Sequence, residues 1–443
     1  MIHRTNADLL LRPRLRRLRD LCRTRQARHV ARKRACVAAV LGGGMCLLLS
    51  ACSNLATMEF DANNAEALRY ARSGDLQREV DSLVEPLIDQ GVTPGAVVGV
   101  LLPDGSTRFF GYGVRDRDGG GRPDGDTLFA VGSLSKGFLG AITDLLVQEG
   151  QLSWSDALEK LLPPDTTLSA DAKKITLLQL VTHTSGLPRQ PYTPEIMIPF
   201  LRYLFTGENF YSPLDRVYVL HYLASFTAPS RVEYQYSNID FGLVGYALEQ
   251  RTGLSVDALL AQKIVKPLGL RNTGYIPEAL PGYATRAHGY AGDQPKFIRR
   301  GAPVPDWQFT RLMRGSAALY STARDLLTFA AAHLKGGGTP FSAALIDTLR
   351  VRFSQPDEST AVAWTVEDVD DQRIAYQLGI VAGYTGYLGL DLKHRTAVVV
   401  LQNTFNWDES VGGKLLIRLA RAQDQWQQGR PVNARLSRQG PTE

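Results

Sequence analysis

The strongest constraint on the fold of this chain is that its strand patterns lie toward both ends of the sequence. Short apolar or alternating runs bounded by turn residues predict strands at 96–102, 107–114, 361–369, 373–380, 387–392 and 396–402. The pattern between them is mainly helical, and further helices are predicted at 75–90 and 410–423. We therefore expect an α/β (α+β) fold, in which an antiparallel sheet built from both chain ends is flanked by helices and carries an inserted, mainly helical lobe.

One short motif in the helical part carries chemistry. Ser133 and Lys136 follow an apolar run, Leu128–Val131, and precede apolar residues at helical spacing. Residues three apart share one face of a helix, so the lysine amine can reach the serine hydroxyl. A serine becomes a useful nucleophile when a base lies next to it. The pattern predicts Ser133 as a nucleophile on the first turn of a buried helix and Lys136 as its proton acceptor; the alternative is a helix-capping serine beside a solvated lysine.

A second motif, Tyr236-Ser237-Asn238, follows later in the chain. The order S-x-x-K and then Y-x-N resembles the serine β-lactamase and penicillin-binding protein superfamily, and specifically its class C β-lactamase-like branch, which includes D,D-carboxypeptidases and esterases. Further segments that resemble blocks of that branch are 175–188, 266–270 and 315–326. The resemblance runs from residue 79 to 420, and it implies the fold described above together with a serine hydrolase activity.

The resemblance also implies a role for each residue of the second motif. Tyr236 stands where the family has a second base, which moves the proton to the leaving group and activates water; on the residues alone, a core aromatic is the alternative. Asn238 would bind Lys136 or the amide of the substrate. The implied reaction is acyl transfer through an acyl-serine, on an ester, a D-amino-acid peptide or a β-lactam. The alternative function is a penicillin- or peptidoglycan-binding sensor that does not turn over.

The third family motif is where this chain departs from the resemblance. The family has Lys or His, a small polar residue and Gly on the strand that faces the nucleophile. Two registers fit here, the Gln-Leu-Gly of 377–379 and the Tyr-Thr-Gly of 384–386. We prefer the first, because residues 383–391 match the family block that follows this motif. The substrate-binding residues implied by this register are Gln377, Gly379 and Ile380, together with Asn238.

Both registers lack the cation with which the family binds the carboxylate of its substrate. Gln377 is neutral, and Arg373 would compensate only if its side chain reached the cleft from the same face of the strand. Ile380 still offers a backbone N–H as the second donor of an oxyanion hole, beside that of Ser133. We therefore expect an intact acylation site with poor recognition of a free carboxylate.

The amino end of the chain predicts export. Residues 1–34 contain 12 Lys and Arg against two Asp, and residues 35–51 contain no charge, which is typical of a secretory signal peptide. The sequence Leu-Ser-Ala-Cys that ends at Cys52 resembles a bacterial lipobox, which implies cleavage before Cys52 and a diacylglyceryl group on its sulfur. The alternative is that Cys52 is only an apolar residue of the signal. We expect a lipid-anchored lipoprotein of the cell envelope, facing the periplasm from the outer membrane.

These signals divide the chain into four predicted segments. They are a signal peptide at 1–51, a lipidated tether at 52–75, a β-lactamase-like serine hydrolase domain at 76–425 and a polar tail at 426–443; a translation start near Val30 is an open alternative. All four cysteines lie at or before Cys52, so the predicted domain has no disulfide and no thiol chemistry. The full chain carries a net charge of +6, of which residues 1–34 supply +10, so the remainder carries −4 and its charge gives no support to nucleic-acid binding.

The other titratable residues indicate no further chemistry. His183 and His288 are expected in loops with structural roles, and no His, Asp and Glu cluster has metal-ligand spacing, so we expect neither a metal nor a cofactor. The expected partners are a small-molecule or peptide substrate and a membrane, through the lipid anchor, and no nucleic acid. The sequence leaves the oligomeric state open.

Overall fold

The computed structural model describes residues 64–356, 358–369, 371–407 and 410–428. The predicted signal peptide, Cys52 and parts of the predicted tether and tail lie outside these residues. The α-helices are α2 (Asn64–Ser73), α3 (Leu76–Asp89), α4 (Ser135–Gln148), α5 (Leu158–Leu161), α6 (Leu177–Val181), α7 (Pro194–Thr206), α8 (Arg216–Ala224), α9 (Asn238–Thr252), α10 (Val256–Leu260), α11 (Lys266–Leu268), α12 (Arg314–Ala317), α13 (Ala323–Leu334), α14 (Pro340–Asp347) and α15 (Ser410–Gln427). The strands are β1 (Gly95–Leu101), β2 (Thr107–Gly113), β3 (Phe129–Gly132), β4 (Leu319–Ser321), β5 (Phe353–Gln355), β6 (Glu358–Thr360), β7 (Thr365–Val369), β8 (Gln372–Val381), β9 (Tyr384–Asp391) and β10 (Thr396–Gln402).

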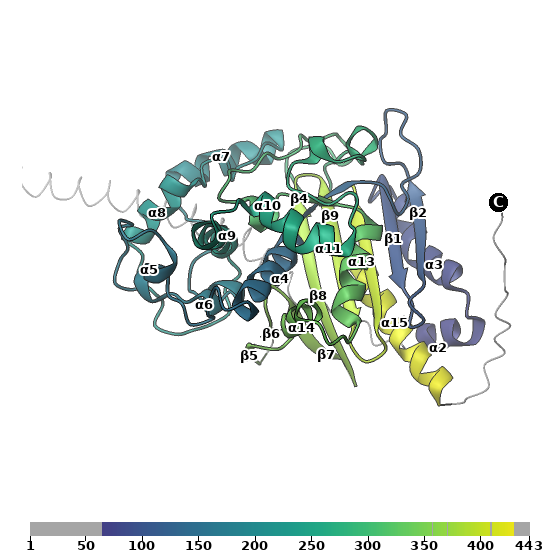
Figure 1. Ribbon diagram of the computed structural model, residues 1–443. Coiled ribbons are helices and arrows are strands. Elements are labelled where there is room, and N and C mark those ends of the chain that lie inside the picture. Colours follow the sequence, from purple (N-terminus) through teal and green to yellow (C-terminus); the bar gives the residue numbers. More distant parts are fainter. Residues whose placement is uncertain (1–63, 357, 370, 408–409, 429–443) are drawn as a thin grey trace, which may run out of the picture. The chain divides into compact units, whose positions relative to one another are not determined.

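Eight strands form one antiparallel sheet in the order β2-β1-β10-β9-β8-β7-β6-β5 (Figure 1). The amino-terminal β1 pairs with the carboxy-terminal β10, with Ala96 opposite Gln402. The predicted sheet built from both chain ends is therefore confirmed. The structure differs at 361–364, which was predicted as strand but precedes β7; Ala363 there has a φ of 66°, outside the extended region. The short strands β5 and β6 were missed because three residues are too few to show alternation.

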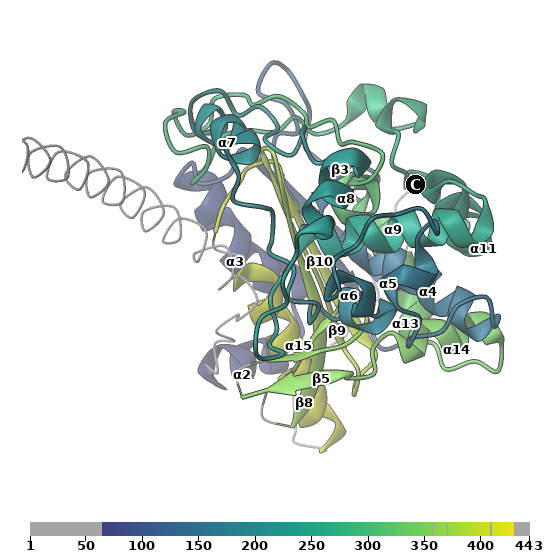
Figure 2. The ribbon, with the colours of Figure 1, turned by 90° about the vertical axis from the view of Figure 1, so that its left-hand side faces the viewer.

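Helices cover both faces of this sheet (Figures 1 and 2). One face packs against α2, α3 and α15 in a core that includes Val98, Tyr387 and Leu415. The approach of α15 is close, because a Cβ on Gly412 would lie 2.1 Å from the ring of Tyr387. The opposite face carries α13 and α4, whose Phe329 and Phe138 rings stack at 3.9 Å between centroids. The sheet therefore fixes α4, the helix that follows Ser133.

The folded part of the chain is longer than predicted at both ends. Residues 64–73, assigned to the tether, form α2, and its Tyr70 and Ala71 are buried against α15. The Trp426 Nε1–H donates to Ala71 O at 2.9 Å, so the start of the predicted tail also belongs to the domain. The boundaries predicted at 76 and 425 are corrected to include both helices. α2 was missed because its ten residues are fewer than the window over which helical periodicity can be recognised.

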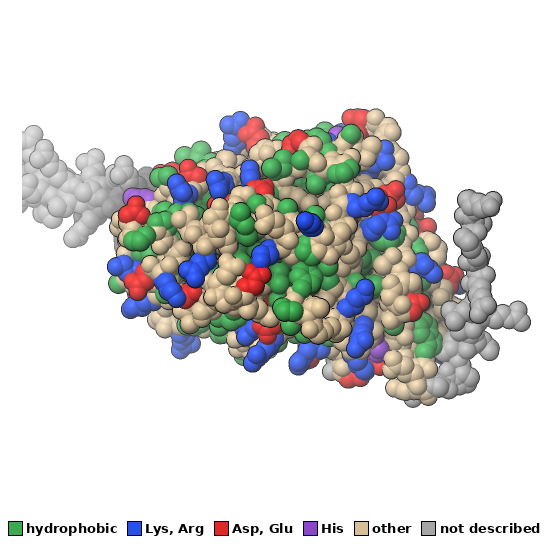
Figure 3. Space-filling view, in the orientation of Figure 1, with side chains coloured by type: hydrophobic (Ala, Val, Ile, Leu, Met, Phe, Trp, Pro, Cys, Tyr) green, Lys and Arg blue, Asp and Glu red, His purple; other side chains and the backbone are tan. Residues whose placement is uncertain are grey.

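Charged side chains of both signs are interspersed on the face of the molecule drawn in Figure 3. Among the described residues, none of the helices has the length and apolar character needed to cross a bilayer. Within the same residues, no group of three or more His, Cys, Asp and Glu could hold a metal ion.

A buried carboxyl on α4 predicts a pH-dependent stability. Burial, and the negative charge of Asp347 on α14, raise the pKa of Asp144 from 3.8 to about 7. Since the folded-state pKa is the higher one, this stabilisation is complete below pH 3.8 and is lost as the pH rises through about 7. Asp144→Asn, which stays neutral, should gain on the order of 2 kcal/mol over the parent between pH 5.5 and pH 8 in urea unfolding. The exposed Asp165→Asn is the control, and parallel pH profiles for parent and Asp144→Asn would contradict the assignment.

Candidate active site

Ser133 lies in the link between β3 and α4 and is half-buried. The helix begins at Ser135, so Ser133 precedes it instead of standing in its first turn as predicted; Lys136 N donates to Ser133 O at 3.0 Å and continues the turn. Gly132 has a φ of 52°, and a Cβ there would lie 2.9 Å from backbone atoms of Ile380. Only glycine tolerates both conditions. The link therefore brings Ser133 against strand β8.

Lys136 is buried beside Ser133, with its amine 3.0 Å from Ser133 Oγ. Two further oxygens surround Nζ, namely Asn238 Oδ1 at 2.9 Å and Ser316 O at 2.7 Å. Burial, followed by the positive charge of Arg189, holds the pKa of Lys136 well below its usual value, while the charge of Asp240 opposes this. A neutral amine has two hydrogens and one lone pair. When it donates to Asn238 and Ser316, this neutral form keeps its lone pair for the hydroxyl hydrogen of Ser133, whereas the ammonium form donates to Ser133 Oγ.

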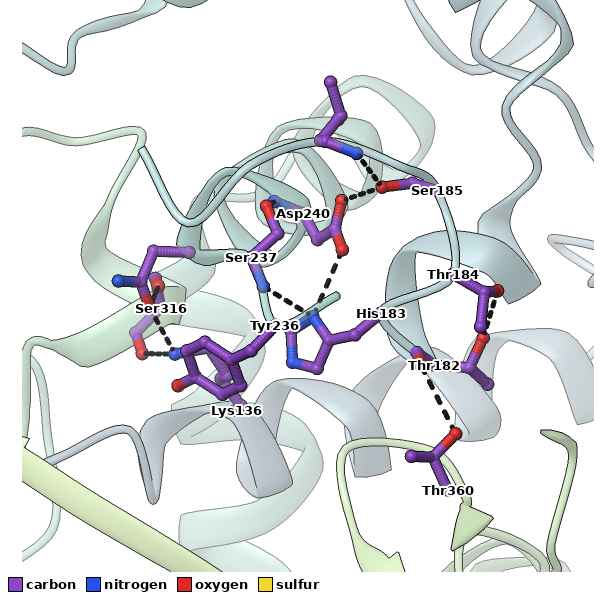
Figure 4. Close-up of polar contacts among 12 residues, drawn as sticks. Lys136, Thr182, His183, Thr184, Ser185, Tyr236, Ser237, Asp240, Ser316 and Thr360 are labelled. Atoms are coloured by element: carbon purple, nitrogen blue, oxygen red, sulfur yellow. Dashed lines mark hydrogen bonds and ion pairs between the residues drawn. The ribbon is translucent and has the colours of Figure 1, made fainter. Parts of the chain in front are cut away.

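Tyr236 completes the contacts of the serine hydroxyl. Its OH donates to Ser133 Oγ at 2.6 Å, from the loop that leads into α9. Ser237, the next residue, caps α9 by accepting from Asp240 N at 3.2 Å, which fixes the direction of the chain at Tyr236. The Lys136 amine lies 4.9 Å from the centroid of the Tyr236 ring, beside it in Figure 4. One hydroxyl is thus in hydrogen-bond reach of both a buried amine and a phenol.

Asn238 connects Lys136 to residues that the sequence did not single out. Its Oδ1 accepts from Lys136, and its Nδ2 donates to Tyr211 OH at 2.9 Å. Ser316, on α12, contributes its carbonyl to Lys136 and its hydroxyl to Asn238 Oδ1 at 3.3 Å. Ser316 lies inside the block 315–326 that carries the family resemblance, which was the available signal; Tyr211 had none. The structure therefore brings the four predicted residues Ser133, Lys136, Tyr236 and Asn238 together in one hydrogen-bonded set.

The strand that faces Ser133 is β8, in the preferred register. A Cβ on Gly379 would lie 2.1 Å from Val131 O, and the Ile380 backbone adjoins Gly132. The alternative residues lie on β9 and are bound elsewhere: Tyr384 OH donates to Ala287 O at 2.9 Å. β8 pairs with β7 only as far as Tyr376, so β7 ends before the stretch beside the nucleophile.

Gln377 is buried instead of facing an open cleft. A Cβ on Gly137 would lie 2.2 Å from Gln377 Nε2, so the amide packs against α4, and neither of its polar atoms has a hydrogen-bond partner. Arg373 does not compensate for the absent cation, because its exposed guanidinium pairs with Asp368 at 2.8 and 2.9 Å. This corrects the expectation that Gln377 is an open contact for substrate. β8 brings backbone but no positive side chain to Ser133.

His183 has a structural position, as expected. Its Nδ1 lies 3.1 Å from Asp240 Oδ2, and Ser237 N donates to the same nitrogen at 3.2 Å (Figure 4). Although this contact has the geometry of an ion pair, burial lowers the pKa of His183 and raises that of Asp240, which favours two neutral groups. Ser185 Oγ also donates to Asp240, at 2.6 Å. The loop of His183 is thereby bound to the start of α9; His288 is exposed.

The fold and the hydrogen-bonded set of Ser133, Lys136 and Tyr236 define a protein of the β-lactamase-like serine hydrolase class. The family model described as beta-lactamase matches residues 80–422. The chain belongs to this family, and the resemblance to the serine β-lactamase and penicillin-binding protein superfamily is confirmed.

Several curated proteins are similar to this chain. The unguisins hydrolase ungD' of Aspergillus campestris is 28% identical over 368 residues, 78% of this chain and 65% of that protein. A beta-lactamase of Pseudomonas fluorescens is 31% identical over 52% of this chain and 59% of its own length. The D-alanyl-D-alanine-carboxypeptidase/endopeptidase AmpH of Escherichia coli is 28% identical over 52% of this chain and 54% of its own length. The chain thus spans less than two thirds of each of these relatives.

Solved structures show the same fold. A class C beta-lactamase from Rhodobacter sphaeroides superposes with a TM-score of 0.64 at 24% identity and covers 77% of this chain and 98% of its own. The D-alanine carboxypeptidase AmpC from Burkholderia cenocepacia has a TM-score of 0.64 at 22% identity and covers 81% and 99%. Because these identities are low, the likeness establishes the mixed α/β architecture and its antiparallel sheet.

Proposed function

We propose that this protein is a lipid-anchored serine hydrolase that cleaves an ester or amide bond through an acyl-serine intermediate. The observation that carries the proposal is the pair of contacts at one hydroxyl, with Lys136 Nζ at 3.0 Å and Tyr236 OH at 2.6 Å from Ser133 Oγ. Burial lowers the pKa of this amine and so favours its uncharged form, which can accept the serine proton. The names of the relatives, which include beta-lactamases and a carboxypeptidase/endopeptidase, support acyl transfer as the reaction class.

The chemistry follows from this arrangement. Ser133 Oγ attacks the carbonyl carbon while its proton passes to the Lys136 amine, and the oxyanion that forms is held by the backbone N–H groups of Ser133 and Ile380. The bond to the leaving group breaks as Tyr236 gives that group its proton, and the Lys136 ammonium returns a proton to the phenolate. Water then attacks the acyl-serine and gives one proton to the same bases. The carboxylic acid leaves and Ser133 regains its hydrogen.

The substrate class that we propose is a neutral ester or amide. In the resemblance, the position of Gln377 holds a cation that binds the substrate carboxylate, and here that position is a neutral, buried amide. The lack of a charge-assisted hydrogen bond to the substrate carboxylate costs roughly 1–2 kcal/mol. This loss corresponds to about tenfold in kcat/KM. A cephalosporin or a D-Ala-D-Ala peptide, each with a free carboxylate, should therefore be a poor substrate relative to a short-chain ester.

A substrate panel tests this proposal. The purified full chain is assayed with p-nitrophenyl acetate, a D-Ala-D-Ala peptide and a chromogenic cephalosporin, and kcat/KM should be highest for the ester. Efficient hydrolysis of the cephalosporin or of the D-Ala-D-Ala peptide by the parent, relative to the ester, would refute the assigned preference.

A time course separates hydrolysis from the alternative of a sensor that does not turn over. Fluorescent penicillin or a fluorophosphonate is added to the protein, and labelled protein is followed on gels. A penicillin label that appears and then decays indicates turnover. A penicillin label that persists, together with no ester hydrolysis, would replace the hydrolase with a penicillin-binding sensor.

The lipid anchor is tested separately from the chemistry. The Leu-Ser-Ala-Cys sequence after an uncharged run motivates the prediction that Cys52 carries the lipid and that the protein faces the periplasm from the outer membrane. In Cys52→Ala, incorporation of labelled palmitate should disappear and the protein should leave the membrane fraction. Cys46→Ala is the control and should remain labelled. Equal labelling of Cys52→Ala and the parent would show that the anchor is elsewhere or absent.

A further inference from the structure

Arg189 is a charged residue beside the proposed bases to which the mechanism above gives no part. It lies in the loop between α6 and α7 and is half-buried. Its guanidinium carbon is 4.6 Å from the centroid of the Tyr236 ring, slightly closer than the Lys136 amine at 4.9 Å. Both distances are within the range of cation–π contacts. The phenol that donates to Ser133 therefore has two basic side chains against its ring.

Backbone hydrogen bonds hold the loop segment of Arg189 next to the segment that follows Tyr236. Asn238 N donates to Arg189 O at 3.2 Å, and Ser237 Oγ donates to Pro188 O at 2.9 Å. These two bonds join the chain on either side of the Pro188–Arg189 peptide to the two residues that follow Tyr236. They fix the backbone from which the Arg189 side chain reaches the Tyr236 ring.

The charge of Arg189 acts on Lys136 as well as on Tyr236. Arginine stays protonated throughout the physiological range, so its charge is permanent. The positive charge lowers the pKa of Lys136, second only to burial. The other titratable groups facing this amine are Tyr236, His183 and Asp240. The negative charge of Asp240 opposes the effect, but burial raises the pKa of Asp240 and so disfavours its charged form.

We propose that Arg189, held in the loop before α7 against the ring of Tyr236, is a positioning residue for the two proposed bases. It orients the Tyr236 phenol through its ring face and favours the uncharged amine of Lys136, which is the form that can take the serine proton. This inference rests on the proposed hydrolase function for its consequence in rate. Its electrostatic part concerns Lys136 alone and can be measured without any substrate.

The first measurement is the titration of Lys136 in the full chain with 13C-labelled lysine. The chain has 11 lysines, and Lys136→Met assigns the Cε signal. In Arg189→Met, the midpoint should rise by about 0.5–1 pH unit, the Coulomb effect of one partly solvated charge at this range. Arg189→Lys should stay near the parent. Arg216→Met is a matched control, because Arg216 stacks on the Tyr246 ring at 5.5 Å.

The second measurement is the pH profile of kcat/KM for p-nitrophenyl acetate. On the acidic side of the profile, where kcat/KM rises with pH, the curve of Arg189→Met should lie at higher pH than that of the parent, by the same amount as the Lys136 midpoint. At the lowest pH values, kcat/KM of Arg189→Met should be about tenfold below that of the parent. Arg189→Lys should restore the curve of the parent. An unchanged Lys136 midpoint in Arg189→Met overturns the proposal, even where activity falls. A shifted midpoint in a protein without any esterase activity would retain the electrostatic role of Arg189 and refute the hydrolase function instead.

Discussion

Ser133→Ala is expected to abolish hydrolysis of every substrate and to remove labelling by fluorophosphonate and fluorescent penicillin. The reason is that the Ser133 hydroxyl is the group that Lys136 Nζ and Tyr236 OH contact, and no acyl-serine can form without it. Rates are measured at high enzyme concentration, since residual binding without the nucleophile could still give a small background.

The loss of hydrolysis can be assigned to the missing hydroxyl only if Ser133→Ala keeps its fold. The methyl group of alanine fits where a half-buried serine stood, and the lost hydrogen bonds change the free energy of unfolding by about 2 kcal/mol or less. Urea unfolding and circular dichroism provide this control. Ser135→Ala is the comparison variant: its hydroxyl donates to Gly132 O at 2.5 Å and accepts from Leu319 N at 3.0 Å, so it supports the site without being the nucleophile. Substantial hydrolysis by a folded Ser133→Ala protein would remove the proposed mechanism.

Tyr236→Phe and Lys136→Ala should each lower kcat by orders of magnitude. Proton transfer by a positioned side chain contributes about 10²–10⁴-fold, and each variant removes one of the two groups that contact Ser133 Oγ. Tyr236→Phe keeps the ring and therefore its packing against His183, at 4.6 Å between centroids. Its loss can then be assigned to the hydroxyl.

Pre-steady-state measurements show which half of the reaction each variant slows. Single-turnover labelling reports acylation, and decay of the label reports deacylation. Lys136→Ala should slow acylation, because the amine takes the serine proton. Tyr236→Phe should slow both steps, because the phenol serves the leaving group and the water. Losses below threefold in both variants would show that the proton moves along another route.

The large elements could be predicted because their patterns are long. The strand at 396–402 was predicted with the bounds of β10, since seven apolar or alternating residues buried on both sides give an unambiguous signal. α2 was missed because only Tyr70 and Ala71 among its described side chains are buried, and they are buried by α15, which lies at the other end of the chain. When a helix is buried by a segment far away in the chain, its own sequence contains little sign of that burial.

In the candidate site, too, some residues could be predicted from the sequence and others could not. Ser133, Lys136, Tyr236 and Asn238 were found because short motifs place their side chains, and the structure brings them together. The carbonyl of Ser316 escaped prediction because every residue has one, and only the fold determines which carbonyl meets the amine. Arg189 escaped it because a contact across loops leaves no spacing in the sequence.

The pairing of β1 with β10 has a consequence for how the active site comes into being. Ser133 and Lys136 are synthesised early. Ile380, whose backbone lies beside Gly132, and strand β10, which pairs with β1, are synthesised much later. Pairing between such distant segments is slow to form, because loop closure precedes any gain from contacts. A chain that ends before β8 would carry an intact Ser-x-x-Lys motif with no strand against it. If Ser133 is the nucleophile as proposed, we expect such a truncated chain to lack the Ile380 backbone of the oxyanion site and to show no hydrolysis.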